Sequence, residues 1–127
     1  MVDLSVKIGD VTLKNPIMPA SGAFSWDYGD VIDLNRLGGL VAKTICREPR
    51  LGNPTPRMAE TEAGIIQSIG LPGKGIDYFL ENIVPEYNKW EPPLIVSVSA
   101  DTAEDFAAMS RDLSVDGVDV VEVNISC

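Results

Sequence analysis

The sequence predicts an α/β fold in which helices cover a parallel sheet. Three runs, residues 40–44, 93–99 and 118–124, are largely apolar, as expected of strands that are buried on both faces. The segments between these runs carry apolar residues at helical spacing, so strands and helices alternate along the chain. Two architectures fit this alternation: an open doubly wound sheet and part of a (β/α)8 barrel.

The elements before the run over residues 40–44 are predicted from alternation, turn residues and helical spacing. Residues 4–16 are expected to form a hairpin that turns at Gly9-Asp10, because apolar and polar residues alternate on both sides of the turn. A short apolar strand is expected over 17–22, where it ends in small residues that allow close backbone approach. Residues 30–39 then predict a helix, which paired glycines bring to an end.

The elements that follow are separated by a long segment rich in proline and glycine. Residues 45–74 are expected to form one long excursion with little regular structure, a feature that is usually functional in compact domains. A helix is predicted over 75–84, and Pro85 is expected to interrupt or end it. Thr102 and the acidic residue three positions later have capping-box-like spacing at the start of a helix over 102–113.

Composition narrows the class of protein. The chain has 127 residues, a net charge of −9 and no histidine, and 45% of its residues are apolar. We therefore expect a packed globule with no nucleic-acid or membrane-surface partner, because an acidic chain is repelled by both. The sequence shows no secretory signal and no membrane-spanning run, so we expect a cytoplasmic protein. Two cysteines and no histidine also argue against a metal site.

Polar side chains gather where the predicted strands end. They are Ser21, Lys43, Thr44, Ser97, Ser99, Asn124, Ser126 and Cys127. A barrel keeps its active site at the carboxyl ends of its strands, whereas the first strand lacks the Gly-x-Gly-x-x-Gly pattern of an open dinucleotide-binding sheet. A barrel takes roughly 250 residues. The sequence therefore predicts that residues 1–127 are the N-terminal half of a single barrel, with an opening hairpin and the first four strands, recorded as a fragment.

The candidate residues each allow an ordinary structural interpretation. Lys43 is either a lysine that extends from the sheet end into solvent or a fixed cation beside an anionic ligand. Asn124 is either a turn residue or a ligand-facing amide. Cys127 is distinguished from Cys46 by its position, because it follows a strand end that already carries other polar groups.

The long segment contains two further candidates. Arg47, Arg50 and Arg57 form the only basic concentration of the chain, which is either a solvated loop or a rim that guides an anionic substrate. The turn around Gly70 presents backbone amides that suit a carboxylate or an imide, but it lacks the pattern of a phosphate-binding P-loop.

Three stretches together resemble a known family. They are KNPIMPASGAF, LGGLVAKTICREPRLGNPTPRMAETEAGIIQSIGLP and VVEVNISC, and in this order and spacing they resemble the N-terminal half of class 1 dihydroorotate dehydrogenase of the B type. The resemblance implies a (β/α)8 enzyme that uses FMN to oxidise (S)-dihydroorotate to orotate in pyrimidine biosynthesis. It also implies an iron-sulfur and FAD subunit as electron-transfer partner, within a homodimer or heterotetramer.

The resemblance also implies roles for individual positions. The residues placed at the cofactor are Ala20, Ser21, Lys43, Thr44, Ser97 and Asn124. The residues placed at the substrate are Lys43, Gln67, Ser68, Ile69, Gly70, Leu71 and Asn124. Cys127 falls on the family's active-site base, and Lys43 would offset negative charge during the reaction. FMN would accept the hydride, and its phosphate would be held beyond residue 127.

Two positions depart from the family pattern. The family usually has asparagine where this chain has Gln67 and Ser97. Gln67 moves the amide by one methylene, and Ser97 keeps only a hydroxyl. These departures leave open a related flavin-dependent barrel that acts on another dihydropyrimidine or cyclic imide. A third alternative is a non-catalytic half-barrel that serves as a binding module, although its open sheet edges favour aggregation.

Overall fold

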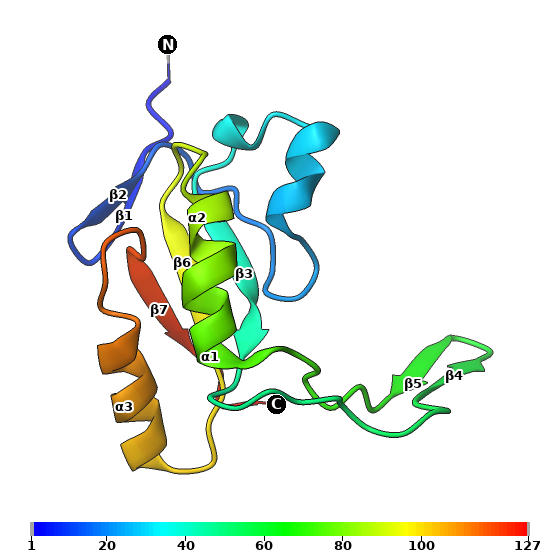
Figure 1. Ribbon diagram of the computed structural model, residues 1–127. Helices are drawn as coiled ribbons and strands as arrows, with labels where there is room; N and C mark the ends of the chain where they lie inside the picture. The colour runs from blue at the N-terminus through cyan, green and yellow to red at the C-terminus, as the bar shows by residue number, and fades with distance from the viewer. Residues whose placement is uncertain (1, 127) are drawn as a thin grey trace.

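The computed structural model describes residues 2–126 and contains a three-stranded parallel sheet at its centre. The strands β3 (Leu40–Ile45), β6 (Leu94–Val98) and β7 (Val120–Val123) lie in the order β3-β6-β7, and both pairings are parallel. Figure 1 shows the helices formed by residues 75–87 and 103–112 packed over one face of this sheet. The predicted α/β class and the strands predicted over 40–44, 93–99 and 118–124 are therefore confirmed.

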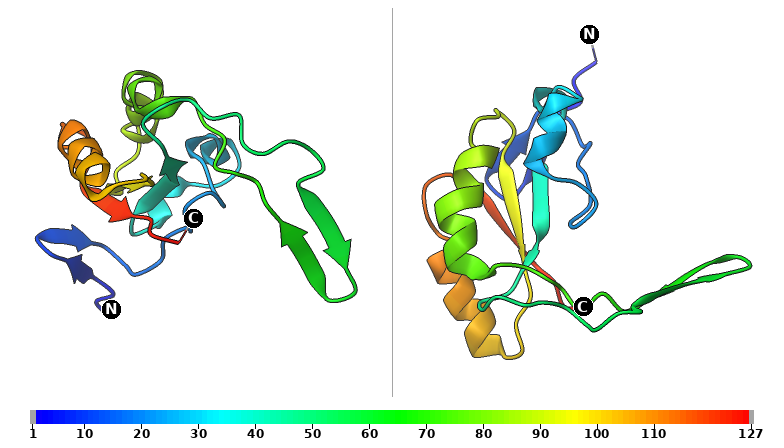
Figure 2. Two further views of the ribbon diagram at one scale, coloured as in Figure 1. Left: turned by 90° about the horizontal axis from the view of Figure 1, so that it is seen from below. Right: turned by 45° about the vertical axis from the view of Figure 1, so that its right-hand side comes forward.

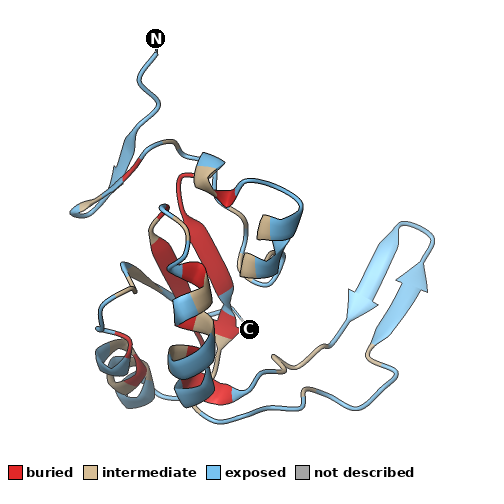
Figure 3. Cartoon of the chain, turned by 45° about the horizontal axis from the view of Figure 1, so that its top comes forward, coloured by how far each residue is buried: buried red, intermediate tan, exposed pale blue. Residues whose placement is uncertain are grey.

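The hydrophobic core lies between the sheet and these helices. Alternate residues of β6, namely Leu94, Val96 and Val98, face the helices, as the two-residue period of a strand requires. Figure 3 shows the buried residues concentrated in the sheet and on the helix surfaces that cover it. The buried cluster comprises Leu34, Leu40, Ala42, Ile76, Phe79, Val84, Tyr87, Leu94, Val96, Val98, Met109 and Leu113.

The opening hairpin forms as predicted. Strands β1 (Val6–Ile8) and β2 (Val11–Leu13) pair antiparallel, and Ile8 lies opposite Val11. Gly9 has a φ of +57°, a value that glycine adopts without steric cost.

The strand expected over 17–22 and the helix expected over 30–39 are not formed. Pro16 and Pro19 have no N–H group to donate to a strand ladder, so regular pairing cannot be maintained along this stretch. The helix is replaced by two 3-10 helices, η1 (Trp26–Asp30) and η2 (Leu34–Arg36). At the start of η2 the Asp33 carboxylate accepts the N–H of Asn35, which starts a new turn where the helix would have continued.

The segment over 45–74 contains regular structure that the sequence prediction missed. Strands β4 (Met58–Thr61) and β5 (Gly64–Gln67) form an antiparallel hairpin whose residues are all exposed. Figure 2 shows this hairpin projecting away from the sheet as an arm. Its two-residue turn is stabilised by the Thr61 hydroxyl, which donates to the carbonyl oxygen of Gly64 at 3.1 Å.

The helix predicted over 75–84 is present in three consecutive parts: α1 (Gly75–Tyr78), the π-helix η3 (Phe79–Ile83) and α2 (Val84–Tyr87). Pro85 interrupts the α-helical hydrogen bonding, as predicted, because it has no N–H for the carbonyl four residues earlier.

The last helix, α3 (Ala103–Asp112), also forms as predicted, and the Thr102 hydroxyl accepts the N–H of Asp105 at its start. No helix within residues 2–126 is both long enough and apolar enough to span a membrane.

Candidate active site

Three polar side chains meet at the carboxyl ends of the three parallel strands. The hydroxyl groups of Thr44 on β3 and Ser97 on β6 are 2.8 Å apart and buried. The side-chain amide of Asn124, just beyond β7, donates from Nδ2 to Thr44 Oγ1 at 3.1 Å. The backbone N–H of Asn124 also extends the β6–β7 ladder by donating to the carbonyl of Val98 at 2.8 Å. Polar groups that are 80 residues apart in the sequence are thereby held in one network.

A β-bulge brings Thr44 into this network. The register between β3 and β6 shifts between Ala42 and Ile45, so that Lys43 and Thr44 together lie opposite the single residue Ser97. A bulge of this kind bends the strand and changes the direction of a side chain. Its consequence is that Ala42 and Ile45, three positions apart, both pack against the helix-facing core.

Lys43 lies beside Thr44 in the bulge and is exposed, whereas Thr44 is buried. The two ion pairs found within residues 2–126 are Arg47–Asp112 and Lys89–Glu86, so the ammonium group of Lys43 has no carboxylate partner there. An exposed ammonium group at a strand end fits both interpretations of Lys43, a side chain that extends into solvent and a cation available to an anionic ligand.

The turn after β7 is organised by Asn124. Its Oδ1 atom accepts both the backbone N–H and the hydroxyl of Ser126, each at 3.1 Å. Ser21, from the segment after β2, lines a small cavity of about 240 Å³ together with residues 122–126. Ala20 accepts the N–H of Ala23 in the tight turn that contains Ser21. The structure thus places Ser21 near the Asn124 turn, although the strand expected to end at Ser21 is not formed.

The predicted substrate stretch, residues 67–71, lies on the return from the projecting hairpin. Gln67 Oε1 accepts the N–H of Ile69 at 3.2 Å, and the amide of Asn53 donates to both the carbonyl and the hydroxyl of Ser68. Gly70 has a φ of +82° and packs tightly against Asn53, and Leu71 also has a positive φ of 49°. The hydrogen bonds of this loop therefore run to the 51–57 segment and not to the strand-end network.

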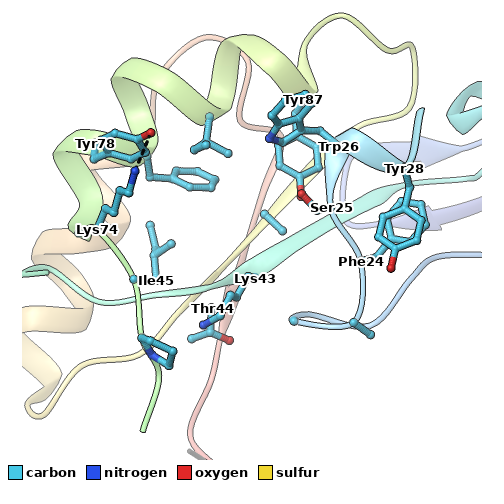
Figure 4. Close-up of a pocket in the computed structure, with 18 residues that line it drawn as sticks. Phe24, Ser25, Trp26, Tyr28, Lys43, Thr44, Ile45, Lys74, Tyr78 and Tyr87 are labelled. Atoms are coloured by element: carbon cyan, nitrogen blue, oxygen red, sulfur yellow. Dashed lines mark hydrogen bonds between the residues drawn. The ribbon is translucent and has the colours of Figure 1, made fainter. Parts of the chain in front are cut away.

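A second cavity, of about 500 Å³, lies beside β3 and was not predicted from the sequence. Figure 4 shows its aromatic wall, to which Phe24, Trp26, Tyr28, Tyr78 and Tyr87 contribute. Lys43 and Thr44 also line it, so the cavity adjoins the strand-end network. Phe24, Trp26 and Tyr28 come from one short stretch of the sequence, but Tyr78 and Tyr87 lie on a distant helix, so no local pattern reveals the complete wall.

Lys74 and Tyr87 give this cavity its polar character. The Lys74 ammonium group donates to the Tyr78 hydroxyl at 3.1 Å and lies 4.2 Å from the centre of its ring. Burial raises the pKa of Tyr87 above its ordinary value, although a hydrogen bond with Ser25 opposes this shift.

Of the two cysteines, only Cys46 lies within the residues that the structure describes. Cys46 is half-buried, and Arg50 Nη1 lies 3.9 Å from its sulfur atom. Cys127 lies outside the described residues, so its predicted role as the base remains a prediction.

The fold and the site together define an α/β protein with a polar centre at the carboxyl ends of parallel strands, where α/β enzymes bind their ligands. The sequence profile of the dihydroorotate dehydrogenase family matches residues 3–127. The chain belongs to the dihydroorotate dehydrogenase family.

Curated relatives match the same region. The chain is 43% identical to the catalytic subunit of dihydroorotate dehydrogenase B (NAD(+)) from Thermoanaerobacter sp. strain X514, over 99% of this chain and 42% of the relative. The proteins of the same name from Desulforamulus reducens and Bacteroides thetaiotaomicron are 46% and 42% identical, over 99% and 100% of this chain. These two matches cover 42% and 43% of the relatives, so the chain spans less than half of their length.

The fold of this chain also occurs in a solved structure. The DHODH from Eimeria tenella, crystallised in complex with ferulenol, superposes with a TM-score of 0.68 at 21% sequence identity. The match covers 98% of this chain and 37% of that protein. This likeness shows that the chain shares its fold with part of that enzyme.

Proposed function

We propose that this chain forms one side of the active site of an enzyme that uses FMN to oxidise (S)-dihydroorotate to orotate in pyrimidine biosynthesis. The observation that carries the proposal is the convergence of Thr44, Ser97 and Asn124 at three strand ends, in a chain that belongs to the dihydroorotate dehydrogenase family. Lys43, which has no ion-pair partner among residues 2–126, lies beside this network and adds the cation that an anionic substrate or cofactor requires.

The residues at the strand ends suit FMN by their chemistry. The ring system of a flavin has a polar edge with both hydrogen-bond donors and acceptors, which calls for a mixed set of protein groups. Lys43 offers only donors, whereas the hydroxyl of Thr44 and the amide of Asn124 offer both. We propose that these residues hold the flavin together with Ala20 and Ser21, while Ser97 supports Thr44 from behind.

The chain also supplies groups for the reaction. Oxidation to orotate removes a proton and a hydride from adjacent carbon atoms of the substrate. We propose that the thiolate of Cys127 takes the proton, and the electron pair of the broken C–H bond forms the C=C bond as the hydride leaves. FMN, when bound, supplies the acceptor for the hydride. Lys43 offsets the negative charge that develops on the substrate carbonyl.

The loop after β5 is proposed to make the remaining contacts with the substrate. We propose that residues 67–71 and Asn124 bind the substrate, with backbone amides around Gly70 facing its carboxylate. The positive φ values at Gly70 and Leu71 mark a tight turn at this point of the loop, which supports close approach of a ligand to its backbone.

The larger assembly is inferred from the relatives. Their names describe a catalytic subunit of an enzyme that uses NAD(+), and this chain spans 42–43% of their length. We propose that residues 1–127 form the N-terminal half of a single (β/α)8 domain. We further propose an iron-sulfur and FAD subunit as the partner that passes electrons to NAD, within a homodimer or heterotetramer in the cytoplasm.

The test uses the full-length protein. It is expected to purify with bound FMN, and dihydroorotate is expected to bleach the flavin absorbance under anaerobic conditions. Cys127→Ser should slow this bleaching severely while FMN remains bound, because a hydroxyl is a far weaker base than a thiolate. Cys46→Ser is the matched control and should reduce at the wild-type rate. Normal reduction in Cys127→Ser would end the assignment of the base.

Gln67 favours a second candidate function. Its amide reaches one methylene further than the asparagine usual in the family, and its oxygen already accepts the N–H of Ile69. A site that hydrogen-bonds a polar ligand is sensitive to such a change, which favours a related dihydropyrimidine or cyclic imide as substrate. Anaerobic mixing with a panel of these compounds decides between the two functions. Rapid bleaching by dihydroorotate alone excludes the second one.

A further inference from the structure

Ser97 lies at the centre of the strand-end network, but its side chain is completely buried. Its exposed fraction is 0%, and its hydroxyl is 2.8 Å from that of Thr44. A ligand at the mouth of the strands cannot contact a group with no accessible surface. Any influence of Ser97 on the site must therefore act through the residue to which it is hydrogen-bonded.

Thr44, the partner of Ser97, is in turn hydrogen-bonded to Asn124. Thr44 Oγ1 accepts a hydrogen bond from Asn124 Nδ2, while Asn124 Oδ1 accepts two hydrogen bonds from Ser126. The amide is thereby held at both ends. If it turned over, its NH₂ group would face the N–H of Ser126, and two donors would oppose each other. The orientation of Asn124 thus depends on a Thr44 hydroxyl that stays in place.

The bulge makes Ser97 the residue that can fix this hydroxyl. Lys43 and Thr44 share Ser97 as their single counterpart on β6, so the ladder alone does not determine which of the two turns inward. The buried hydrogen bond with Ser97 favours Thr44 as the inward residue, because an unsatisfied buried hydroxyl is costly. Lys43 is then left as the exposed residue of the pair.

We propose that Ser97 is a positioning residue that acts through Thr44, fixes the amide of Asn124 and keeps Lys43 directed to the outside of the bulge. It does not contact the ligand. The consequence for flavin and substrate rests on the proposed function, whereas the effect on Asn124 is a property of the protein without any ligand.

The test compares variants of the full-length protein. Ser97→Ala and Thr44→Val each remove one hydroxyl with little change of shape. The first measurement is the side-chain ¹⁵N–¹H signal of Asn124 in flavin-free protein with labelled asparagine, which we expect to shift and to lose exchange protection in both variants. The second is the dissociation constant of FMN, which we expect to rise by about 2- to 12-fold in Ser97→Ala, as for the loss of one net hydrogen bond.

Two controls separate positioning from general loss of stability. Thr44→Ser keeps the hydroxyl and should restore the signal of Asn124. Ser110→Ala removes a hydrogen bond of 2.8 Å between a hydroxyl and a backbone carbonyl within α3, and should change neither measurement.

The outcomes distinguish this inference from the proposed function. An unchanged signal of Asn124 in Ser97→Ala overturns the positioning role, as does an equal weakening of FMN binding by Ser110→Ala. If the wild-type protein binds no flavin, the proposed function fails, but the signal of Asn124 still decides whether Ser97 positions it.

Discussion

The backbone of Gly38 lies against the carbonyl oxygen of Asn15, so closely that a Cβ atom at Gly38 would be 1.8 Å from that oxygen. The N–H of Gly38 donates to the carbonyl of Ile17 at 2.8 Å, and the Asn15 side chain donates to the carbonyl of Arg36 at 3.0 Å. These contacts fasten the segment after the opening hairpin to the start of β3. Glycine is required at position 38 because no side chain fits there.

We therefore expect Gly38→Ala to lower the free energy of unfolding by about 1–3 kcal/mol, the usual cost of forcing extra atoms into a packed site. Gly64→Ala is the matched control, because a Cβ atom there meets nothing within 4 Å. Urea unfolding of the full-length protein measures both. Equal midpoints for the two variants would contradict the clash.

Gly38 also illustrates what the sequence could and could not predict of the fold. The apolar runs predicted β3 and β6 because burial on both faces leaves a compositional signal. The paired glycines at 38 and 39 suggested a helix stop, but the structure uses Gly38 for close backbone packing. Such a contact depends on a partner 23 residues away, about which the local sequence carries no information.

The start of α3 offers a second test of stability. The Thr102 hydroxyl accepts the N–H of Asp105 at 3.1 Å and donates to its carboxylate at 3.0 Å. We expect Thr102→Ala to destabilise the protein by about 0.5–2 kcal/mol, because the helix loses its N-cap. Thr102→Ser keeps a capping hydroxyl and should remain close to the wild type in thermal unfolding. If serine and alanine at this position unfold together, the cap does not contribute.

The candidate site was predictable in part. Strand ends collect functional groups in parallel sheets, so Thr44 and Asn124 could be proposed as neighbours before their contact was known. The β-bulge could not be predicted, because the apolar pattern of β3 carries no information on its register with β6. The bulge leaves Lys43 exposed and Thr44 buried, so the sequence alone could not assign these two orientations.

Lys43 provides a functional prediction. We expect Lys43→Ala to slow flavin reduction by dihydroorotate by about 10- to 150-fold, which corresponds to the loss of one hydrogen bond to a charged group. Lys74→Ala is the matched control: this lysine lines the same cavity, but its ammonium group is already engaged by Tyr78. Stopped-flow absorbance under anaerobic conditions measures both rates. A larger loss in Lys74→Ala would show that the wrong cation has been assigned.

Tyr87 predicts how stability depends on alkaline pH. Burial raises the pKa of Tyr87 in the folded protein above its ordinary value near 10. Above about pH 10 the unfolded chain releases this proton while the folded protein still holds it, so the free energy of unfolding falls as the pH rises towards the folded pKa. Below the pKa of the unfolded chain both states keep the proton, so Tyr87 adds no pH dependence to the free energy of unfolding there.

We therefore expect Tyr87→Phe to flatten the loss of stability above pH 10. It should also lower the free energy of unfolding at neutral pH by about 0.5–1.5 kcal/mol, because the hydrogen bond with Ser25 is lost. Urea unfolding at a series of pH values from 7 to about 11 measures both effects. Tyr28→Phe is the control, since it removes the hydroxyl of an exposed tyrosine from the same cavity wall. If both variants change the alkaline slope equally, burial of Tyr87 is not the cause.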